Sequence, residues 1–319
     1  MNYKLISSNL EQQCIPYPAF ENGVREIHRL HRRMTLGLKP EILPIIGETG
    51  AGKSTLLRHI CSQYPIIKTN VYDEIPFLYV PIPKSISNKK VLVEVLRALG
   101  DVEEYSRLNE VLLQQKVLQK LKQANVKVIL VDEFQHLVST KKKEVNYDVA
   151  DFFKVLLDTT QISIVTAGLP DTALIYESNE QFARRARNAI RLDRLKWESS
   201  GDSMLLASII AGFSKIAKPL IFPNPLDNKV SFRWYCATGG SIGYISKIYS
   251  GAIEIAESQN LTEISLEILH QSQLNVQYKL ENSFLYAFSD DFDLSKENAC
   301  LKKLKINKGR QKNIGAVHE

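Results

Sequence analysis

The chain has 319 residues, of which 44% are hydrophobic and 24% charged, and its formal net charge is +6. This length allows about two domains with a sizeable core. No apolar run is long enough to cross a bilayer and the polar first residues lack a signal-peptide pattern, so we expect a cytoplasmic protein without a membrane partner.

Residues 1–35 form an N-terminal segment ahead of the first expected strand. Within it, His28 and His31 share a helical face in the string HRLHRR. The neighbouring arginines would repel a metal cation, and no third ligand of the usual kind is nearby. We therefore expect a basic helix face exposed to solvent.

An apolar run at residues 42–46 precedes GETGAGKST, a complete G-x-x-x-x-G-K-[ST] phosphate-binding loop. Its glycines let backbone N–H groups turn toward a triphosphate, Lys53 reaches the β- and γ-phosphates, and the Ser54 hydroxyl can ligate Mg²⁺. The helix expected to follow favours anions at its N-terminus. Strand, loop and helix together predict a nucleotide site formed by Gly47, Glu48, Thr49, Gly50, Ala51, Gly52, Lys53, Ser54 and Thr55.

A second strand is expected at residues 77–80, followed by amphipathic helices at 90–99 and 108–124. The apolar run at 128–131 is typical of a central parallel strand, and Asp132 and Glu133 stand at its carboxyl end, where open α/β sheets bind ligands. Asp132 is placed to hold Mg²⁺, directly or through water, and Glu133 to polarise the attacking water. Gln135 and His136 complete a D-E-x-Q-H string that resembles helicases superficially, but no other helicase-like element is visible.

The next segments predict a helix at 148–157, a strand at 162–165 and a final strand at 189–192. Thr166 follows the fourth strand, where a polar side chain can touch the γ-phosphate or the attacking water, so it is a candidate sensor. A hydroxyl satisfied by the turn is the alternative. Strands and helices that alternate in this way predict a parallel, doubly wound sheet of five strands.

The pattern beyond residue 200 is helical, with helices expected at 204–216, 230–237, 242–257 and 264–271. The tail from residue 290 onward has acidic residues followed by LKKLKINKGRQK and little periodic hydrophobicity. We therefore expect four parts, namely the N-terminal segment at 1–35, an α/β nucleotide-binding domain at 36–199, a helical domain at 200–282 and a basic, flexible tail at 283–319.

These motifs resemble AAA+ ATPases and, within them, the TnsC/TniB family of DNA-transposition regulators. The resemblance covers about residues 15–275 and rests on GETGAGKST, VILVDEFQHL, TAGLPDT, QFARRA and ATGGSIGYISKI. It implies an AAA+ P-loop NTPase fold with a small all-α lid, using ATP and Mg²⁺. It also implies a ring or helical homo-oligomer on double-stranded DNA that links a target-selection protein of the TniQ type to transposase subunits, with ATP hydrolysis driving disassembly. Members of this compact size occur in CRISPR-associated and mercury-resistance transposons.

The resemblance assigns roles position by position. Lys53 and Ser54 match the phosphate and magnesium positions, while Asp132 and Glu133 match the metal and catalytic acidic positions. Thr166 resembles the first sensor.

Two arginine positions also follow from the resemblance. In such proteins an arginine just before the last strand reaches the neighbouring subunit's site; Arg185 fits best and Arg184 next, with a solvated charge run as the alternative. Many members have a second arginine in the lid, at the position of Gly243 here. Lys247, one turn later, is the candidate substitute.

DNA contacts are expected on the segments between the phosphate loop and the Asp132 strand, which suggests Lys84, Lys89 and Lys90. A second possibility is the run formed by Lys141, Lys142 and Lys143. Phosphate contacts of this kind are independent of sequence and sensitive to salt. For the C-terminal tail, docking of transposase or DNA and a solvated terminus are equal alternatives.

Two other functions stay open. A replication initiator or helicase loader would use the same fold, but would usually bring a DNA-reading or helicase-binding domain, and none is evident. A non-hydrolysing scaffold would use ATP only to control assembly on DNA. Glu133 and Arg185 argue against that second alternative.

Overall fold

A computed structural model describes residues 1–70, 72–84, 87–101, 103, 105, 108–138, 147–276 and 286–293. The chain forms two compact units: Pro18–Asp193, and Met1–Tyr17 together with Arg194–Glu319. The expected N-terminal segment of residues 1–35 is therefore divided between the two units. Among the described residues, no helix combines the length and the apolar character that crossing a membrane requires.

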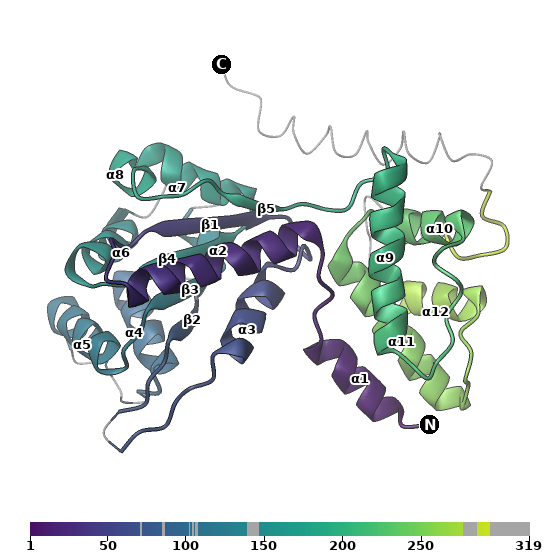
Figure 1. Cartoon of the computed structure of the whole chain (residues 1–319), viewed down its shortest axis with the longest axis horizontal. Helices are drawn as coiled ribbons and strands as arrows, with labels where there is room; N and C mark the ends of the chain where they lie inside the picture. The colour runs from purple at the N-terminus through teal and green to yellow at the C-terminus, as the bar shows by residue number, and fades with distance from the viewer. Residues whose placement is uncertain are drawn as a thin grey trace. The chain divides into compact units, whose positions relative to one another are not determined.

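The unit Pro18–Asp193 is built on a five-stranded sheet in the order β2-β3-β4-β1-β5 (Figure 1). All four neighbouring pairs are parallel, which confirms the predicted sheet. The continuous apolar runs form strands because both faces of the sheet are covered. The strands are β1 (Ile42–Gly47), β2 (Phe77–Pro81), β3 (Val128–Asp132), β4 (Ser163–Gly168) and β5 (Ile190–Leu192).

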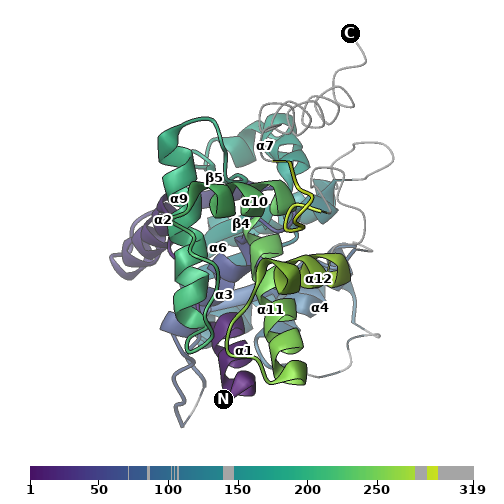
Figure 2. The same cartoon turned by 90° about the vertical axis from the view of Figure 1, so that its right-hand side faces the viewer.

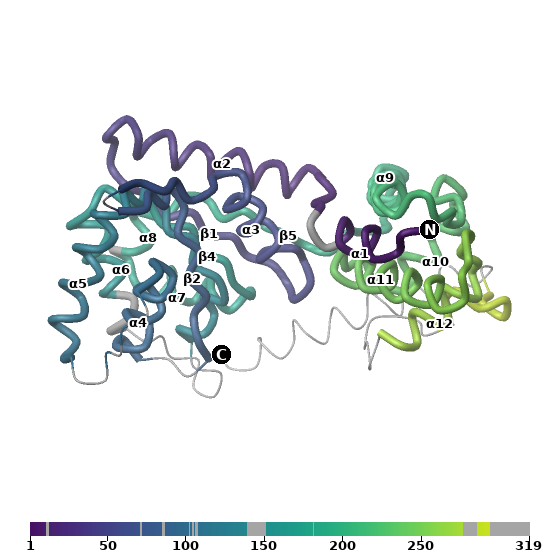
Figure 3. Tube along the Cα trace, turned by 90° about the horizontal axis from the view of Figure 1, so that it is seen from below, coloured from purple at the N-terminus to yellow at the C-terminus, as the bar shows by residue number. Residues whose placement is uncertain are grey.

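Helices lie on both faces of this sheet (Figure 3). On one face α2 and α3 pack so closely that a Cβ on Gly23 would come within 2.5 Å of the Leu56 side chain. On the other face α4, α5 and α6 share one hydrophobic core with the sheet. Their bounds are α2 (Pro18–Thr35), α3 (Lys53–Gln63), α4 (Asn88–Ala98), α5 (Glu110–Gln123) and α6 (Tyr147–Thr159), and the short elements are η1 (Phe134–Leu137), η2 (Pro170–Thr172), α7 (Ala173–Ser178) and α8 (Glu180–Ala183).

The exposed basic face expected around His28 and His31 is found only in part, because Arg29 and Arg32 are exposed while both histidines are half-buried. The His31 ring stacks on Phe77 with centroids 5.0 Å apart and lies equally close to Tyr64. The Nε2 atom of His28 lies 2.9 Å from the side-chain oxygen of Gln63. These partners come from α3 and β2, so helical spacing within α2 alone could not indicate them.

The second unit is helical, and it includes a helix that precedes the sheet unit in sequence. This helix, α1 (Tyr3–Gln12), lies beside α11, which follows the sheet unit (Figures 1 and 2). The Tyr3 hydroxyl donates to the carbonyl oxygen of Leu261 at 2.8 Å. The other helices are α9 (Ser200–Ile216), α10 (Asn228–Thr238), α11 (Ile242–Gln259) and α12 (Leu266–Val276), close to the expected positions.

Part of the expected flexible tail packs on this helical unit. Ala287 and Phe288 are fully buried, and the Phe288 ring meets the Trp234 ring edge-on at 5.0 Å. Arg233 of α10 donates to the carbonyl oxygens of Ala287 and Ser289 at 2.9 and 2.7 Å. Residues 286–293 are thus anchored, while residues 294–319 lie outside the described part of the chain.

Candidate nucleotide site

The phosphate loop connects β1 to α3, and its glycines meet two different demands. Gly50 and Gly52 have φ values of 77° and 89°, which residues with a Cβ rarely adopt. Gly47 lies so close to β5 that a Cβ would come within 2.3 Å of the carbonyl oxygen of Leu192. The resulting path places the loop at the N-terminus of α3, where unpaired N–H groups and the helix dipole favour an anion.

Lys53 adds a positive charge to this loop. Its ammonium donates to the carbonyl oxygens of Gly47 and Glu48 at 2.7 and 2.9 Å. Burial lowers the pKa of Lys53, while the charges of Asp132, Glu133 and Glu48 act in the opposite direction. The donor set, an ammonium and a helix N-terminus, fits the phosphates of a nucleotide.

Asp132 is oriented by two hydrogen bonds at the end of β3. The carboxyl group is 2% exposed, and it accepts the Tyr79 hydroxyl at 2.7 Å and the Glu133 N–H at 2.9 Å. Burial and the contact with Asp132 raise the pKa of Tyr79 to about 12, so this hydroxyl stays a donor. Such outer hydrogen bonds fix the direction of a metal-binding carboxylate.

A magnesium ion would depend on the nucleotide for part of its ligand shell. Among the described residues, no three His, Cys, Asp or Glu side chains are grouped to hold a metal ion. The Ser54 hydroxyl and the Asp132 carboxylate are oxygen ligands of the kind that Mg²⁺ prefers, and it usually takes the rest from phosphates and water. The residues present therefore fit a nucleotide-bound magnesium ion.

Glu133 stands in an unusual backbone conformation at the start of η1. Its φ is 58°, in the left-handed region, and its side chain is 48% exposed. Its Oε2 atom accepts a hydrogen bond from the Gln135 amide and lies 3.9 Å from Nε2 of His136. Sequence reasoning gave no weight to Gln135 and His136; their position just after the acidic pair was the signal that could have found them.

Thr166 does not join this group. It is fully buried, and its hydroxyl oxygen lies 2.5 Å from that of Tyr176 on α7. Thr166 pairs in register with Val131, so it faces the side of the sheet opposite to Asp132, because successive strand residues alternate. The geometry supports a satisfied internal hydroxyl, and the sensor role stays a prediction without support from it.

The two candidates for an arginine finger, an arginine that reaches into the neighbouring subunit's nucleotide site, each have an acidic partner within the chain. Arg184 is 74% exposed and lies 2.6 Å from Glu180, one helical turn away. Arg185 is 37% exposed and forms an ion pair with Asp158 on α6. Exposed ion pairs of this kind contribute about 0–1 kcal/mol, so either side chain can exchange its partner at little cost.

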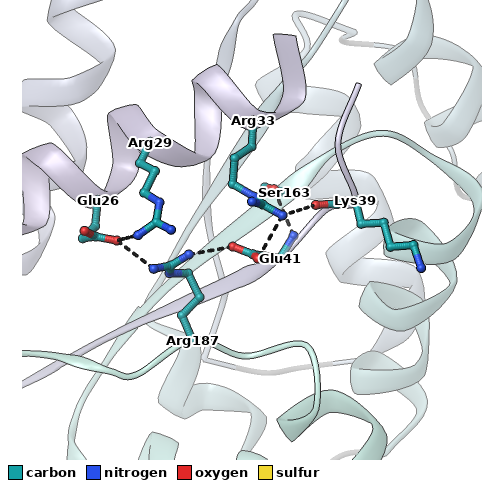
Figure 4. Close-up of polar contacts among 7 residues, drawn as sticks. All are labelled: Glu26, Arg29, Arg33, Lys39, Glu41, Ser163 and Arg187. Carbon is teal, nitrogen blue, oxygen red and sulfur yellow. Dashed lines mark hydrogen bonds and ion pairs between the residues drawn. The ribbon is translucent and has the colours of Figure 1, made fainter. Parts of the chain in front are cut away.

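Arg187, two residues further along, belongs to a network that connects α2 to the residues ahead of β1 and β5 (Figure 4). Its guanidinium contacts Glu26 of α2 at 3.2 Å and Glu41 at 2.9 Å. Arg33 and Arg29 of α2 lie 3.0 and 3.6 Å from the same two carboxylates. Arg187 therefore ties the segment that carries Arg184 and Arg185 to α2 and to the residue ahead of β1.

The remaining candidates lie away from the phosphate loop in sequence. Lys84 follows β2, and Lys89 and Lys90 are in the first turn of α4. Lys141, Lys142 and Lys143 lie outside the described residues. Gly243 and Lys247 are on α11, where the Lys247 ammonium lies 5.5 Å from the centre of the Tyr244 ring.

Comparison with known protein families finds a match for most of the chain. Residues 6–197 match the family described as bacterial TniB protein, which is more than half of the chain. The chain belongs to the TniB family. A search among curated proteins finds no significant match.

The fold of this TniB-family chain is similar to that of ORC and CDC6 proteins. The Aeropyrum pernix ORC2 protein in its ADP form has a TM-score of 0.63 at 14% identity, with 86% of this chain and 73% of that chain covered. CDC6P from Pyrobaculum aerophilum has a TM-score of 0.63 at 14% identity, with 86% of this chain and 72% of that chain covered. The Aeropyrum pernix ORC1 protein in complex with DNA has a TM-score of 0.60 at 16% identity, with 82% of this chain and 66% of that chain covered. Identity this low shows the fold alone, and the fold is that of AAA+ P-loop NTPases followed by a helical domain, as the sequence predicted.

Proposed function

We propose that this TniB-family chain is an ATP-dependent regulator of DNA transposition. It assembles on double-stranded DNA and links a target-selection protein of the TniQ type to transposase subunits, and ATP hydrolysis drives disassembly. The observation that carries the proposal is one site at the carboxyl edge of the sheet. There Lys53 at the phosphate loop lies within electrostatic reach of Asp132 and Glu133.

Each side chain of this site has a defined task in hydrolysis. The loop and Lys53 would hold the β- and γ-phosphates, and Ser54 and Asp132 would hold Mg²⁺, which would neutralise phosphate charge. Tyr79 keeps the Asp132 carboxylate in its orientation through the 2.7 Å hydrogen bond. Glu133 is the general base, orienting the attacking water and accepting its proton.

The same nucleotide joins neighbouring subunits in this proposal. Arg185, or Arg184, leaves its own acidic partner and reaches the γ-phosphate in the next subunit's site. Supporting this, both side chains are more than one-third exposed and lie ahead of β5. An arginine that reaches the γ-phosphate in this way accelerates hydrolysis by about 10³- to 10⁵-fold, so assembly and turnover are coupled.

Contacts with DNA are assigned to Lys84, Lys89 and Lys90, with Lys141, Lys142 and Lys143 as a second group. The structural neighbour ORC1 from Aeropyrum pernix is in complex with DNA, which supports a duplex partner for this fold. Binding through phosphates alone would be independent of sequence and would weaken steeply with salt. A regulator that accepts many target sites needs that property.

Electron microscopy of the protein with duplex DNA and ATP tests the proposal. We expect rings or helical filaments on the DNA, which Lys53→Ala abolishes and Glu133→Gln preserves for longer, because that variant binds ATP without hydrolysing it. Lys122→Ala, an exposed lysine of α5, is the matched control and should assemble normally. Persistent monomers without DNA association at low salt, or normal assembly of Lys53→Ala, would contradict the proposal.

Two alternatives have distinct outcomes. A replication initiator or helicase loader would use the same fold, and capture of a replicative helicase rather than a transposase would support it. A non-hydrolysing nucleotide-dependent scaffold would show DNA assembly with ATP but no turnover. Equal inactivity of the wild type and Glu133→Gln, with DNA present, would favour the scaffold.

A further inference from the structure

The end of β4 offers no polar side chain to the nucleotide site. Thr166 faces the opposite side of the sheet, and the next three residues are Ala167, Gly168 and Leu169. Yet this strand end is the hydrogen-bonded neighbour of β1, with Gly168 opposite Ile46, next to the start of the phosphate loop. A group that reports on the phosphates through β4 must therefore contact its backbone.

Gln135 makes that contact. Its side-chain oxygen accepts the Leu169 N–H at 3.1 Å, and its side-chain nitrogen donates to Oε2 of Glu133. An N–H on one side and a carboxylate on the other allow only this orientation of the amide. One side chain thus connects the end of β4 to the acidic residue that acts on water.

Gly168 leaves the space that this connection requires. A Cβ on Gly168 would come within 3.0 Å of the Gln135 side-chain oxygen and 3.1 Å of its backbone nitrogen. It would also lie 2.1 Å from the hydroxyl of Thr172, so a side chain there would displace both neighbours. The glycine at this strand end is therefore required first by Thr172, and it also lets Gln135 approach closely.

We infer that Gln135 is a positioning residue that couples the phosphate loop to Glu133 through the end of β4. The inference rests on the proposed function, in which Glu133 orients the attacking water. Gln135 holds one carboxylate oxygen, Oε2, and leaves the other for the water. Because its amide does not ionise, it can fix Glu133 without exchanging protons with it.

The coupling follows the order of contacts along the sheet edge. A nucleotide that shifts the loop after β1 displaces its neighbour β4, and the Leu169 N–H moves with it. Gln135 transmits this shift to the Glu133 carboxylate, whose backbone in the left-handed region already restricts its position. Glu133 reaches its working position only when the loop is occupied.

Two substitutions separate the hydrogen bonds of Gln135 from its shape. Gln135→Met keeps the length and removes both bonds, and we expect kcat to fall by about 10- to 100-fold with little change in KM, since a small displacement of a base has a cost of this size. In Gln135→Glu the introduced carboxyl, when protonated, accepts from Leu169 and donates to Glu133 as the amide does. When ionised, it repels Glu133.

The pH dependence of Gln135→Glu is therefore diagnostic. Its kcat relative to the wild type should rise as the pH falls from about 9 to about 6, because the protonated form regains the hydrogen bond. The ratio for Gln135→Met should stay constant over the same range. A purely structural role would lower both variants equally at every pH and would overturn the inference.

A second readout needs neither nucleotide nor activity. Hydrogen exchange of the Leu169 amide should be at least several-fold faster in Gln135→Met than in the wild type, and unchanged in Gln115→Met, an exposed residue of α5 that serves as the matched control. Unchanged exchange at Leu169, or an unchanged kcat in Gln135→Met, would overturn the inference. If the wild type itself fails to hydrolyse ATP on DNA, the proposed function fails and so does the role of Gln135 in catalysis. The exchange result then still decides whether the contact exists.

Discussion

At the scale of single residues, the arginines at 184, 185 and 187 differ in what holds their guanidinium groups. Arg184 and Arg185 have one acidic partner each, and both side chains are more than one-third exposed. Arg187 lies between two carboxylates and is mostly shielded from solvent. Three arginines in one short string therefore have two different expected roles.

This difference predicts opposite effects of substitution. Arg185→Ala or Arg184→Ala should lower ATP hydrolysis by the DNA-bound assembly by about 10³-fold or more and leave the unfolding midpoint unchanged. Arg187→Ala should instead lower the free energy of unfolding by about 1–3 kcal/mol, because it leaves charged partners unpaired. ATPase assays and thermal unfolding of each variant measure both quantities.

A mixing experiment provides the control. Subunits with Glu133→Gln and subunits with Arg185→Ala are each expected to be inactive alone. Mixed on DNA, they form some interfaces in which an intact Glu133 faces an intact Arg185, so activity should return in part. Absence of any recovery, or loss of activity in Arg187→Ala without loss of stability, would contradict this division of roles.

The sequence predicts the site residues whose chemistry is contained in a short motif. Lys53, Asp132 and Glu133 follow from the spacing of glycines and of carboxylates after an apolar run, and the structure brings them together. The sequence did not predict Gln135, because the partner of its side chain is a backbone N–H at the end of another strand. Thr166 shows the converse, since its position at a strand end was visible but the face it occupies was not.

At the scale of elements, the contact of α2 with α3 and β2 depends on an uncharged histidine. Burial lowers the pKa of His31, and the positive charges of His28 and Lys127 lower it further. The folded state thus favours the neutral ring, so its contribution to stability is complete above the ordinary value of 6.5 and decreases as the pH falls through that value. Below the lowered pKa the loss is complete.

We therefore predict that the sheet unit unfolds more easily at pH 5.5 than at pH 7.5. His31→Phe keeps a ring against Phe77 and removes the ionisable group, so the difference between the two pH values should become smaller. Denaturant unfolding at pH 5.5 and at pH 7.5 measures the free energy of unfolding of each protein and hence this difference. Some dependence should remain, because burial also lowers the pKa of His59 on α3; an identical dependence in wild type and variant would refute the prediction.

The anchor at residues 286–293 gives a prediction for the helical unit. Phe288→Ala removes a fully buried ring from its contact with Trp234, and it should lower the free energy of unfolding by about 3–5 kcal/mol. Tyr286→Ala is the control, because that side chain is 63% exposed and should change stability by no more than about 0.5 kcal/mol. Unfolding followed by circular dichroism distinguishes the two, and equal stability of both variants would show that the anchor is dispensable.

Elements were predictable where the signal was local. Each strand of the sheet is a continuous apolar run or a β-rich segment, and all five lie within a few residues of the expected positions. The packing of α1 on α11 and of Phe288 on Trp234 was not predictable in this way. Both join segments far apart in the sequence, and neither leaves a periodic pattern that identifies its partner.

At the scale of the whole molecule, the sheet unit is continuous in sequence and the helical unit is not. Pro18–Asp193 forms the sheet unit and contains the phosphate loop, Asp132, Glu133 and the candidate arginines Arg184 and Arg185. The TniB match at residues 6–197 covers this unit, most of the first part of the helical unit and only the beginning of its second part.

The division of the helical unit also sets an order of events during synthesis. The ribosome makes α1 first, but its partners α9 and α11 emerge only after the whole of Pro18–Asp193. At about 5–20 residues per second, the wait from the end of α1 to the start of α11 is roughly 12 to 46 s, during which the apolar face of α1 is uncovered. All five strands of the sheet unit have been made before α9 and α11, so this unit can fold before them. A nascent chain of this protein would thus possess its phosphate loop in folded form before the lid that accompanies it exists.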